Sequence, residues 1–189
     1  MRPLFASSGL LLVWLMSFAS LAQTPAPVNG SANPPEVSAA LPQAQWVGKA
    51  RLKVWGFDIY DATLWSAPGF SAARYASHPL ALELVYLRDF AAADIAERSI
   101  KEMRRSGNFT TAQAATWMEA MRKVFPDVKK GDRILGQHRP GVGTVIWFNG
   151  KLSGEIADPE FSRLFFGIWL SPGTSEPAMR AALLAGAAP

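Results

Sequence analysis

The chain has 189 residues, of which 49% are apolar and 18% are charged, and it carries a formal net charge of +4. That length suits one globular domain with a sizeable core, and the apolar fraction excludes disorder throughout. Apolar stretches of about 20 residues do not recur, which excludes a polytopic membrane protein. The lack of cysteine excludes disulfides, thiolate metal sites and a cysteine nucleophile.

The first 22 residues predict a secretory signal peptide. Arg2 precedes an apolar run over residues 4–18, and Ser20-Leu21-Ala22 supplies the small residues of a cleavage site. An uncleaved membrane anchor is the alternative, but the apolar centre Leu10–Met16 is much shorter than the roughly 20 residues that span a bilayer. We therefore expect export and a periplasmic location in a bacterium, with no stable membrane anchor after cleavage.

Residues 23–43 have a composition of their own. They are rich in proline and alanine, and Glu36 is their single charge. A segment without a periodic apolar face cannot build a core, so we predict a disordered linker here. The folded domain is expected over residues 44–187.

Alternation of apolar and polar residues predicts an antiparallel sheet from Trp46 onward. The first strand places Lys49, Arg51 and Lys53 on one face, opposite an apolar set made of Trp46, Gly48, Ala50, Leu52 and Val54. Further strands are expected over 57–65, 79–88, 142–148 and 151–156, with a short one at 134–135. Asn149-Gly150 favours a two-residue type I′ hairpin between the last two.

Helical patterns come mostly after the first three strands. One is expected over 91–105 with Asp89 as a possible cap, and a second follows the Thr110-x-x-Gln113 capping box and ends at Pro126. A third opens at Asp158-Pro159, and a fourth begins after Ser175. Because strands and helices are segregated, the sequence predicts the α+β class, with helices packed on one face of a mainly antiparallel sheet.

Several kinds of chemistry are excluded by what the sequence lacks. His78 and His138 do not have the spacing of metal ligands, and no Gly-x-Ser-x-Gly motif occurs. Gly141 and Gly143 precede a strand instead of a helix, which excludes a phosphate-binding loop. The cations of 91–105 alternate with carboxylates and indicate a solvated face, so we expect no nucleic-acid partner, no metal and no cofactor.

The remaining candidates are cationic and aromatic. We single out five residues as possible ligand-binding groups: Arg51, Tyr60, Trp65, Tyr86 and Arg88. In one interpretation Arg51 lies on the solvent-exposed face of an edge strand, and the aromatic residues belong to the core. In the other, Arg51 offers its planar, permanently charged guanidinium to a carboxylate or enolate inside an apolar cleft. Spacing alone leaves both open.

Four stretches, in order along the chain, form a further pattern. They are Gly48–Trp65, Tyr86–Phe90, Phe125-Pro126-Asp127 with Gly131-Asp132, and Phe165–Leu170. Together they resemble the bacterial chalcone isomerase-like proteins over about residues 45–185. The resemblance implies the chalcone isomerase fold, which is an antiparallel sheet with helices against one face and a ligand cleft between them.

The resemblance also implies two kinds of activity. Chalcone isomerases close a chalcone to a flavanone with an Arg, a Tyr, a Thr and an Asn, whereas fatty-acid-binding members use the Arg for an acyl carboxylate. Arg51 best matches that Arg, but residues 89–95 hold no Tyr, and the Thr and Asn have no assigned counterparts. Since donors to an enolate are a large part of such catalysis, we expect a non-catalytic domain that binds a fatty acid or similar amphipathic carboxylate.

Two alternatives remain. One is an isomerase or lyase that acts by intramolecular conjugate addition through other donors. The other is a periplasmic accessory that acts through protein contacts, for which we would expect an exposed apolar patch on the 161–170 helix.

Overall fold

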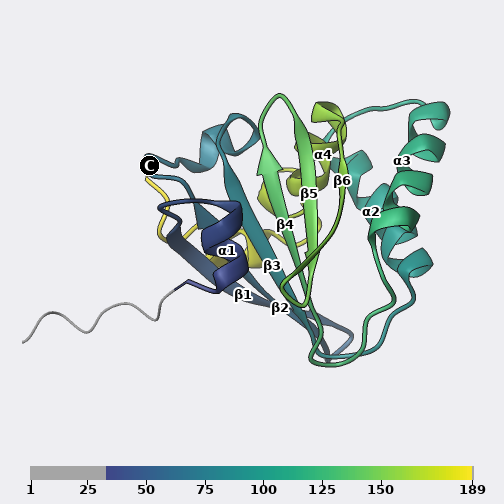
Figure 1. Ribbon diagram of the computed structural model, residues 1–189, viewed down its shortest axis with the longest axis horizontal. Coiled ribbons are helices and arrows are strands. Elements are labelled where there is room, and N and C mark those ends of the chain that lie inside the picture. Colours follow the sequence, from purple (N-terminus) through teal and green to yellow (C-terminus); the bar gives the residue numbers. More distant parts are fainter. Residues whose placement is uncertain (1–32, 189) are drawn as a thin grey trace, which may run out of the picture. The chain divides into compact units, whose positions relative to one another are not determined.

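The computed structural model describes residues 33–188, and they form one six-stranded antiparallel sheet in the order β1-β2-β3-β4-β5-β6 (Figure 1). The strands are β1 (Gln45–Val54), β2 (Phe57–Ser66), β3 (Leu80–Tyr86), β4 (Arg133–Arg139), β5 (Gly143–Phe148) and β6 (Lys151–Ile156). The predicted α+β class and antiparallel sheet are confirmed. The predicted signal peptide, and residues 23–32 of the predicted linker, lie outside the described residues.

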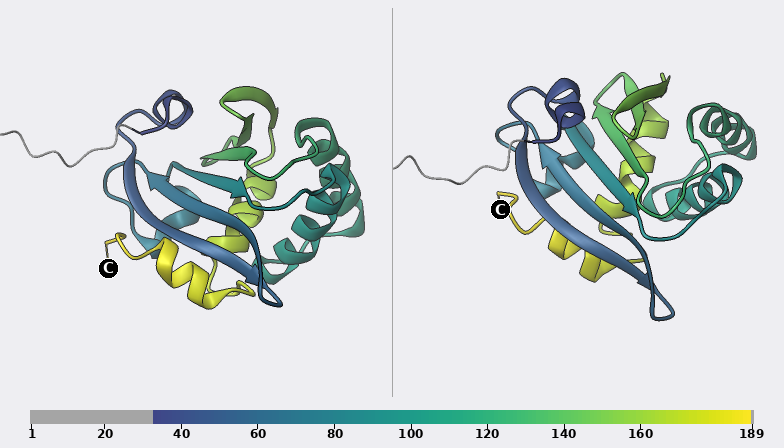
Figure 2. Two further views of the ribbon diagram at one scale, coloured as in Figure 1. Left: turned by 90° about the horizontal axis from the view of Figure 1, so that it is seen from below. Right: turned by 60° about the horizontal axis from the view of Figure 1, so that its bottom comes forward.

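Six helical segments accompany the sheet: α1 (Pro35–Ala40), the 3-10 helix η1 (Ala72–Ser77), α2 (Ala92–Ser106), α3 (Thr111–Val124), α4 (Pro159–Leu170) and α5 (Pro177–Leu183). Helices α2 to α5 lie over one face of the sheet, here called the inner face, and α1 lies on the other, the outer face (Figures 1 and 2). Among residues 33–188, no helix has the length and apolar character needed to cross a bilayer.

Two of the predicted helix caps are confirmed, and two others are wrong. Thr110 and Gln113 form the expected capping box of α3, and Asp158 accepts two backbone N–H groups at the start of α4. Asp89 does not cap α2, because the first N–H of that helix, on Ala92, donates to Asp127 instead. Ser175 does not cap α5, which begins after Glu176 without a side-chain cap.

A bulge near the start of β1 corrects the predicted face of Trp46. Trp46 pairs with Trp65 and Gly48 pairs with Leu64, which leaves Val47 as an extra residue. An extra residue reverses the alternation before it, so Val47 enters the core while the Trp46 side chain is largely in water. The free carbonyl of Val47 accepts the N–H of Gly186 at 2.9 Å.

Helix α5 lies directly against β1 and forms one wall above the inner face. A Cβ atom at Gly48 would collide with the carbonyl oxygens of Ala182 and Leu183. Only glycine allows the helix backbone to approach the strand this closely. The position of α5 therefore depends on Gly48, and the side chains of α5 reach over β1 and β2.

Residues 33–43 are folded, in contrast to the predicted disordered linker. The segment contains α1, whose Val37 is fully buried and whose Ala40 and Leu41 pack with Trp65 on the outer face. Glu36 makes an ion pair with Arg133 at 2.7 Å. Pro35 occupies the first turn, where a missing N–H costs nothing, but a helix of six residues is too short to show an apolar period in the sequence.

Removal of two methyl groups at Val37 tests whether α1 is part of the folded unit. Val37→Ala is expected to lower the free energy of unfolding by about 2 kcal/mol, because the side chain is fully enclosed. Ser38→Ala, on the exposed side of the same helix, is the control and should have little effect. Chemical denaturation of both variants measures the difference, and equal stabilities would show that the segment is not docked.

Candidate ligand-binding cavity

A cavity of about 350 Å³ lies between the inner face of the sheet and helices α2, α4 and α5. Most of the side chains that line it are apolar. They are Leu52, Val54, Ile59, Leu84, Phe90, Ile95, Phe125, Ile134, Phe165, Ile168, Trp169 and Met179. A volume of this size falls within the range of about 300–1,000 Å³ found for small-molecule sites.

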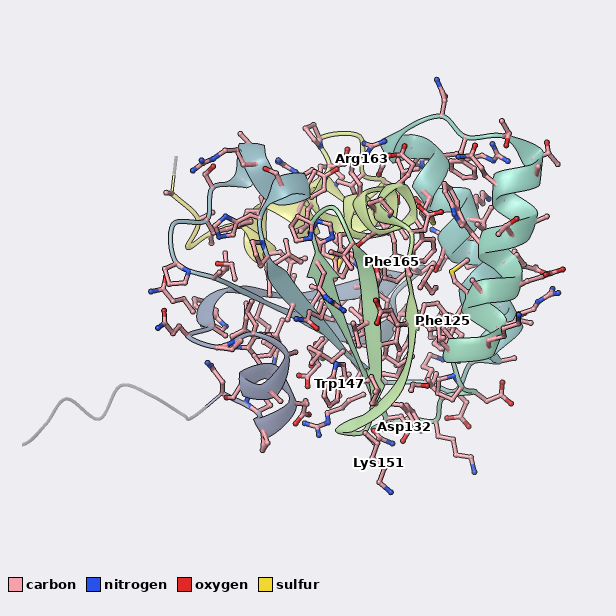
Figure 3. The ribbon with its side chains drawn as sticks, turned by 45° about the horizontal axis from the view of Figure 1, so that its top comes forward. Phe125, Asp132, Trp147, Lys151, Arg163 and Phe165 are labelled. Carbon is pink, nitrogen blue, oxygen red and sulfur yellow. The ribbon has the colours of Figure 1, made fainter. Side chains whose placement is uncertain are left out.

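One end of the cavity is closed by aromatic and aliphatic side chains. Phe125 follows α3 and Phe165 belongs to α4, and their ring centroids are 5.9 Å apart (Figure 3). A second hollow of about 20 Å³ adjoins this end, sharing Leu84, Ile134, Phe165 and Trp169 with the main cavity. The side chains that the two hollows share carry no charge, so this part of the cavity suits a hydrocarbon.

The hydroxyl of Tyr60 supplies a hydrogen-bond donor to the cavity. It accepts a hydrogen bond from Nε1 of Trp169 at 3.0 Å, and no acceptor for its own proton occurs within residues 33–188. Burial raises the pKa of Tyr60 to about 12, so the phenol stays protonated at neutral pH. The ring of Tyr86 lies 5.9 Å from that of Tyr60, and burial raises the pKa of Tyr86 as well.

Charged side chains from α2 and from the start of α5 mark the other end of the cavity. Nη2 of Arg98 lies 2.9 Å from Oε1 of Glu102, and Arg105 contacts the second oxygen of the same carboxylate at 3.3 Å. Glu102 therefore has two cations against its single charge. Asp94 and Glu176 also line the cavity, and neither makes an ion pair in the described part of the chain.

Two of the five predicted site residues, Tyr60 and Tyr86, meet in this cavity, whereas Arg51 does not reach it. Arg51 lies on the outer face, where its guanidinium binds Asp61 at 2.6 Å and Asp58 at 3.0 Å. This contact holds the pKa of Asp61 below its usual value. Because side chains alternate along β1, Leu52 points inward and Arg51 points outward. The interpretation that Arg51 is solvent-exposed is therefore right, and its placement in the cleft is wrong.

Trp65 and Arg88 also lie outside the cavity. Trp65 points to the outer face, where it is buried beneath α1. The guanidinium of Arg88 lies 4.6 Å from the ring centroid of Phe57, beside the tip of the β1–β2 hairpin. Strand alternation turns Leu64 inward and Trp65 outward, whereas Arg88 lies in the exposed segment after β3.

Arg98 lines the cavity but was not among the residues predicted from the sequence. It lies on an exposed helix among mixed charges, a pattern typical of a solvated face. Its side chain is 59% exposed, yet it lines the cavity because α2 covers the gap between α4 and the sheet. Only the packing of α2 distinguishes it from Arg104 and Arg105 on the same helix.

His138 and Ser162 form a buried pair that could suggest a nucleophile and its base. Nε2 of His138 is 3.0 Å from the carbonyl oxygen of Ala76, which can only accept, so Nε2 carries the proton. Nδ1 lies 2.6 Å from Oγ of Ser162, and that hydroxyl accepts a hydrogen bond from Thr144 at 2.8 Å and lies 2.9 Å from the carbonyl oxygen of Gly143. Neither His138 nor Ser162 lines the cavity, so the network joins α4 to β4 and β5 and meets no ligand there.

The chain belongs to the chalcone isomerase-like family, whose sequence model matches residues 28–185. An uncharacterized protein of Haemophilus influenzae is 27% identical over 148 residues, which cover 77% of this chain and 71% of that protein. A fatty-acid binding protein of Arabidopsis thaliana has a similar structure, with a TM-score of 0.60, 9% identity, and coverage of 76% of this chain and 87% of the other. These findings confirm the family resemblance and the predicted fold.

The buried histidine predicts a pH dependence of stability. Burial lowers the pKa of His138, so the unfolded chain binds a proton near pH 6.5 that the folded chain does not. The stability contributed by neutral His138 is complete above that pH and is lost as the pH falls through the lower, folded pKa. His138→Gln should therefore show a shallower loss of stability than the wild type between about pH 7 and 5 in thermal melts. Parallel curves would contradict this.

Proposed function

We propose that the protein binds a fatty acid or a similar small amphipathic molecule in the cavity and does not chemically convert it. The observation that carries this proposal is the division of one cavity of about 350 Å³ into a hydrocarbon end and a polar end. The polar end offers the Tyr60 hydroxyl and the Arg98 guanidinium. The Arabidopsis neighbour, described as a fatty-acid binding protein, supports the same class of ligand.

The apolar part of the ligand would supply most of the binding energy. A chain lying between Phe125, Phe165 and Ile134 would replace an apolar void with contacts and remove its own surface from water, at about 25 cal/mol per Å². The walls come from both the sheet and the helices. Because these elements form one core, the cavity is already shaped before the ligand arrives.

The head group of the ligand would lie near Tyr60 and Arg98. A carboxylate can accept the phenolic proton and pair with the free donors of the guanidinium, which make charge-assisted hydrogen bonds. Glu176 and Asp94 add negative charge to the cavity lining. They would repel a second negative charge, so we propose a head group with one acid function at most.

Conversion of a ligand by conjugate addition is the second candidate. The hydroxyls of Tyr60 and Tyr86 are protonated at neutral pH, and these donors could stabilise an enolate. Turnover of a chalcone by the purified protein would favour this function over simple binding. The accessory interpretation loses its predicted surface, because the large apolar side chains of α4 are buried.

We further propose that the protein is exported and works in the periplasm. The support is the signal-peptide pattern of residues 1–22. Amino-terminal sequencing of protein from a periplasmic extract, expected to begin at Gln23, tests this proposal separately from ligand binding.

A side chain that fills the cavity should abolish binding. Ser99 of α2 is buried and lines the cavity, and Ser99→Phe would occupy the space that a ligand needs. Glu97→Phe, on the exposed side of the same helix, is the matched control. Calorimetric titration with palmitate should give saturable heat for the wild type and Glu97→Phe, and none for Ser99→Phe. Binding by Ser99→Phe with wild-type affinity would exclude the cavity as the site.

Arg98, and not Arg51, should contribute to recognition of the acid group. Arg98→Ala is expected to weaken palmitate binding by about tenfold, since it removes one charge-assisted contact at a partly exposed position. Arg105→Ala is the control, because it removes the other partner of Glu102 without touching the cavity. Arg51→Ala should bind as the wild type does. Loss of affinity in Arg51→Ala alone would reverse the assignment.

A further inference from the structure

Two hairpin turns in the sheet have the same backbone conformation but very different residues. Asn149-Gly150 joins β5 to β6 with φ angles of 48° and 81°, and Trp55-Gly56 joins β1 to β2 with φ angles of 50° and 83°. A turn with two positive φ angles favours Asn-Gly, because asparagine tolerates the left-handed region. Tryptophan is a poor choice for this turn, so the folding of the hairpin does not explain Trp55.

Packing does not explain Trp55 either. Its side chain is 94% exposed, and Phe57, the next large residue, is 56% exposed. The hairpin projects beyond the ends of the neighbouring strands (Figure 2). Two large aromatic side chains are thus exposed on a projecting hairpin.

Cations without ion-pair partners in residues 33–188 lie at the same end of the sheet. Arg88 covers the ring of Phe57, and the backbone N–H of Lys130 binds Asp89, the next residue, at 2.8 Å. Lys151 follows the other hairpin turn, near Asp132 (Figure 3). With Lys129, these four exposed side chains belong to the loops and turns at the end of the sheet that carries the aromatic tip, and they are called the cationic border here.

The carboxylates at this end are held close to the protein. Asp89 and Asp132 accept backbone N–H groups of the 129–130 loop, and Asp127 accepts the first N–H of α2. Asp58 is bound by Arg51 and Lys53. These carboxylates reduce the net positive charge at this end of the sheet. The side chains that extend into solvent are the cations and the two aromatic rings.

We propose that the Trp55–Phe57 tip and its cationic border make a reversible contact with the surface of an anionic phospholipid bilayer. Tryptophan and phenylalanine partition into the interfacial layer of a membrane, and arginine and lysine side chains beside them meet lipid phosphates. Val54 and Ile59 flank the tip and line the cavity, so this contact would bring the cavity close to the lipid. Binding of a ligand in the cavity is not needed for the contact itself.

Substitution of the turn residue separates this contact from folding. Trp55→Asn gives both hairpins the same Asn-Gly turn, so its melting temperature should equal or exceed that of the wild type. Its binding to phosphatidylcholine vesicles that contain phosphatidylglycerol should be weaker by about tenfold. Vesicle sedimentation measures the affinity, and quenching by brominated acyl chains reports whether Trp55 enters the bilayer.

Two further variants complete the experiment. Trp46→Asn removes another exposed tryptophan, at the opposite end of β1, and should bind vesicles as the wild type does. Lys130→Glu should bind anionic vesicles at least about fivefold more weakly, since each cation near such a surface contributes about 1 kcal/mol.

Equal vesicle binding by the wild type and Trp55→Asn would overturn the proposal, as would equal losses in Trp46→Asn and Trp55→Asn. Capture of a folded protein through Trp55, without binding of vesicles, would also overturn it in favour of a protein partner. Palmitate titration of Trp55→Asn without vesicles should match the wild type, so failure of the membrane contact and failure of the cavity as a ligand site remain distinguishable.

Discussion

The two-residue alternation of the strands is the constraint on which the cavity depends. Neighbouring residues of a strand point to opposite faces of the sheet, and the pairing of residues 48–52 with residues 60–64 of β2 fixes which residues of β1 point inward. Leu52 therefore lines the cavity while Arg51 binds two aspartates on the outer face. A shift of one residue would exchange the two side chains and place a guanidinium among the aromatic rings. The chemistry of the cavity is thus a consequence of register.

Helix packing determines why an empty space persists beside a well-filled core. Helix α4 fills the centre of the inner face with large aromatic side chains, and α5 is drawn close to β1 by Gly48. Helix α2 packs on α3 and α4, which leaves room between it and the strands. An apolar void gives up dispersion contacts, so its persistence between well-packed elements is more easily explained by a ligand than by stability.

The sequence was sufficient wherever the determining interactions are local. The alternation of β1 from Gly48 onward, the Asn149-Gly150 turn and the caps at Thr110 and Asp158 involve residues a few positions apart, and all four were predicted correctly. Tyr60 and Tyr86 were also identified. The face occupied by Arg51, the docking of α1 and the role of Arg98 depend on contacts between distant segments. The spacing of residues along the chain does not predict which face of the sheet the helices cover, or the distance between a helix and the sheet.

The C-terminal segment protects the edge of the sheet from pairing with a strand of another molecule. β1 is an edge strand, and the carbonyl group freed by its bulge is already bonded to Gly186. An edge that keeps its hydrogen-bonding groups free can recruit a strand from another molecule, which is how sheets grow into aggregates. The bulge, the lysines of β1 and the Gly186 contact together make this edge a poor template. These groups lie outside the cavity lining, so the edge strand is protected by features that are separate from the ligand site.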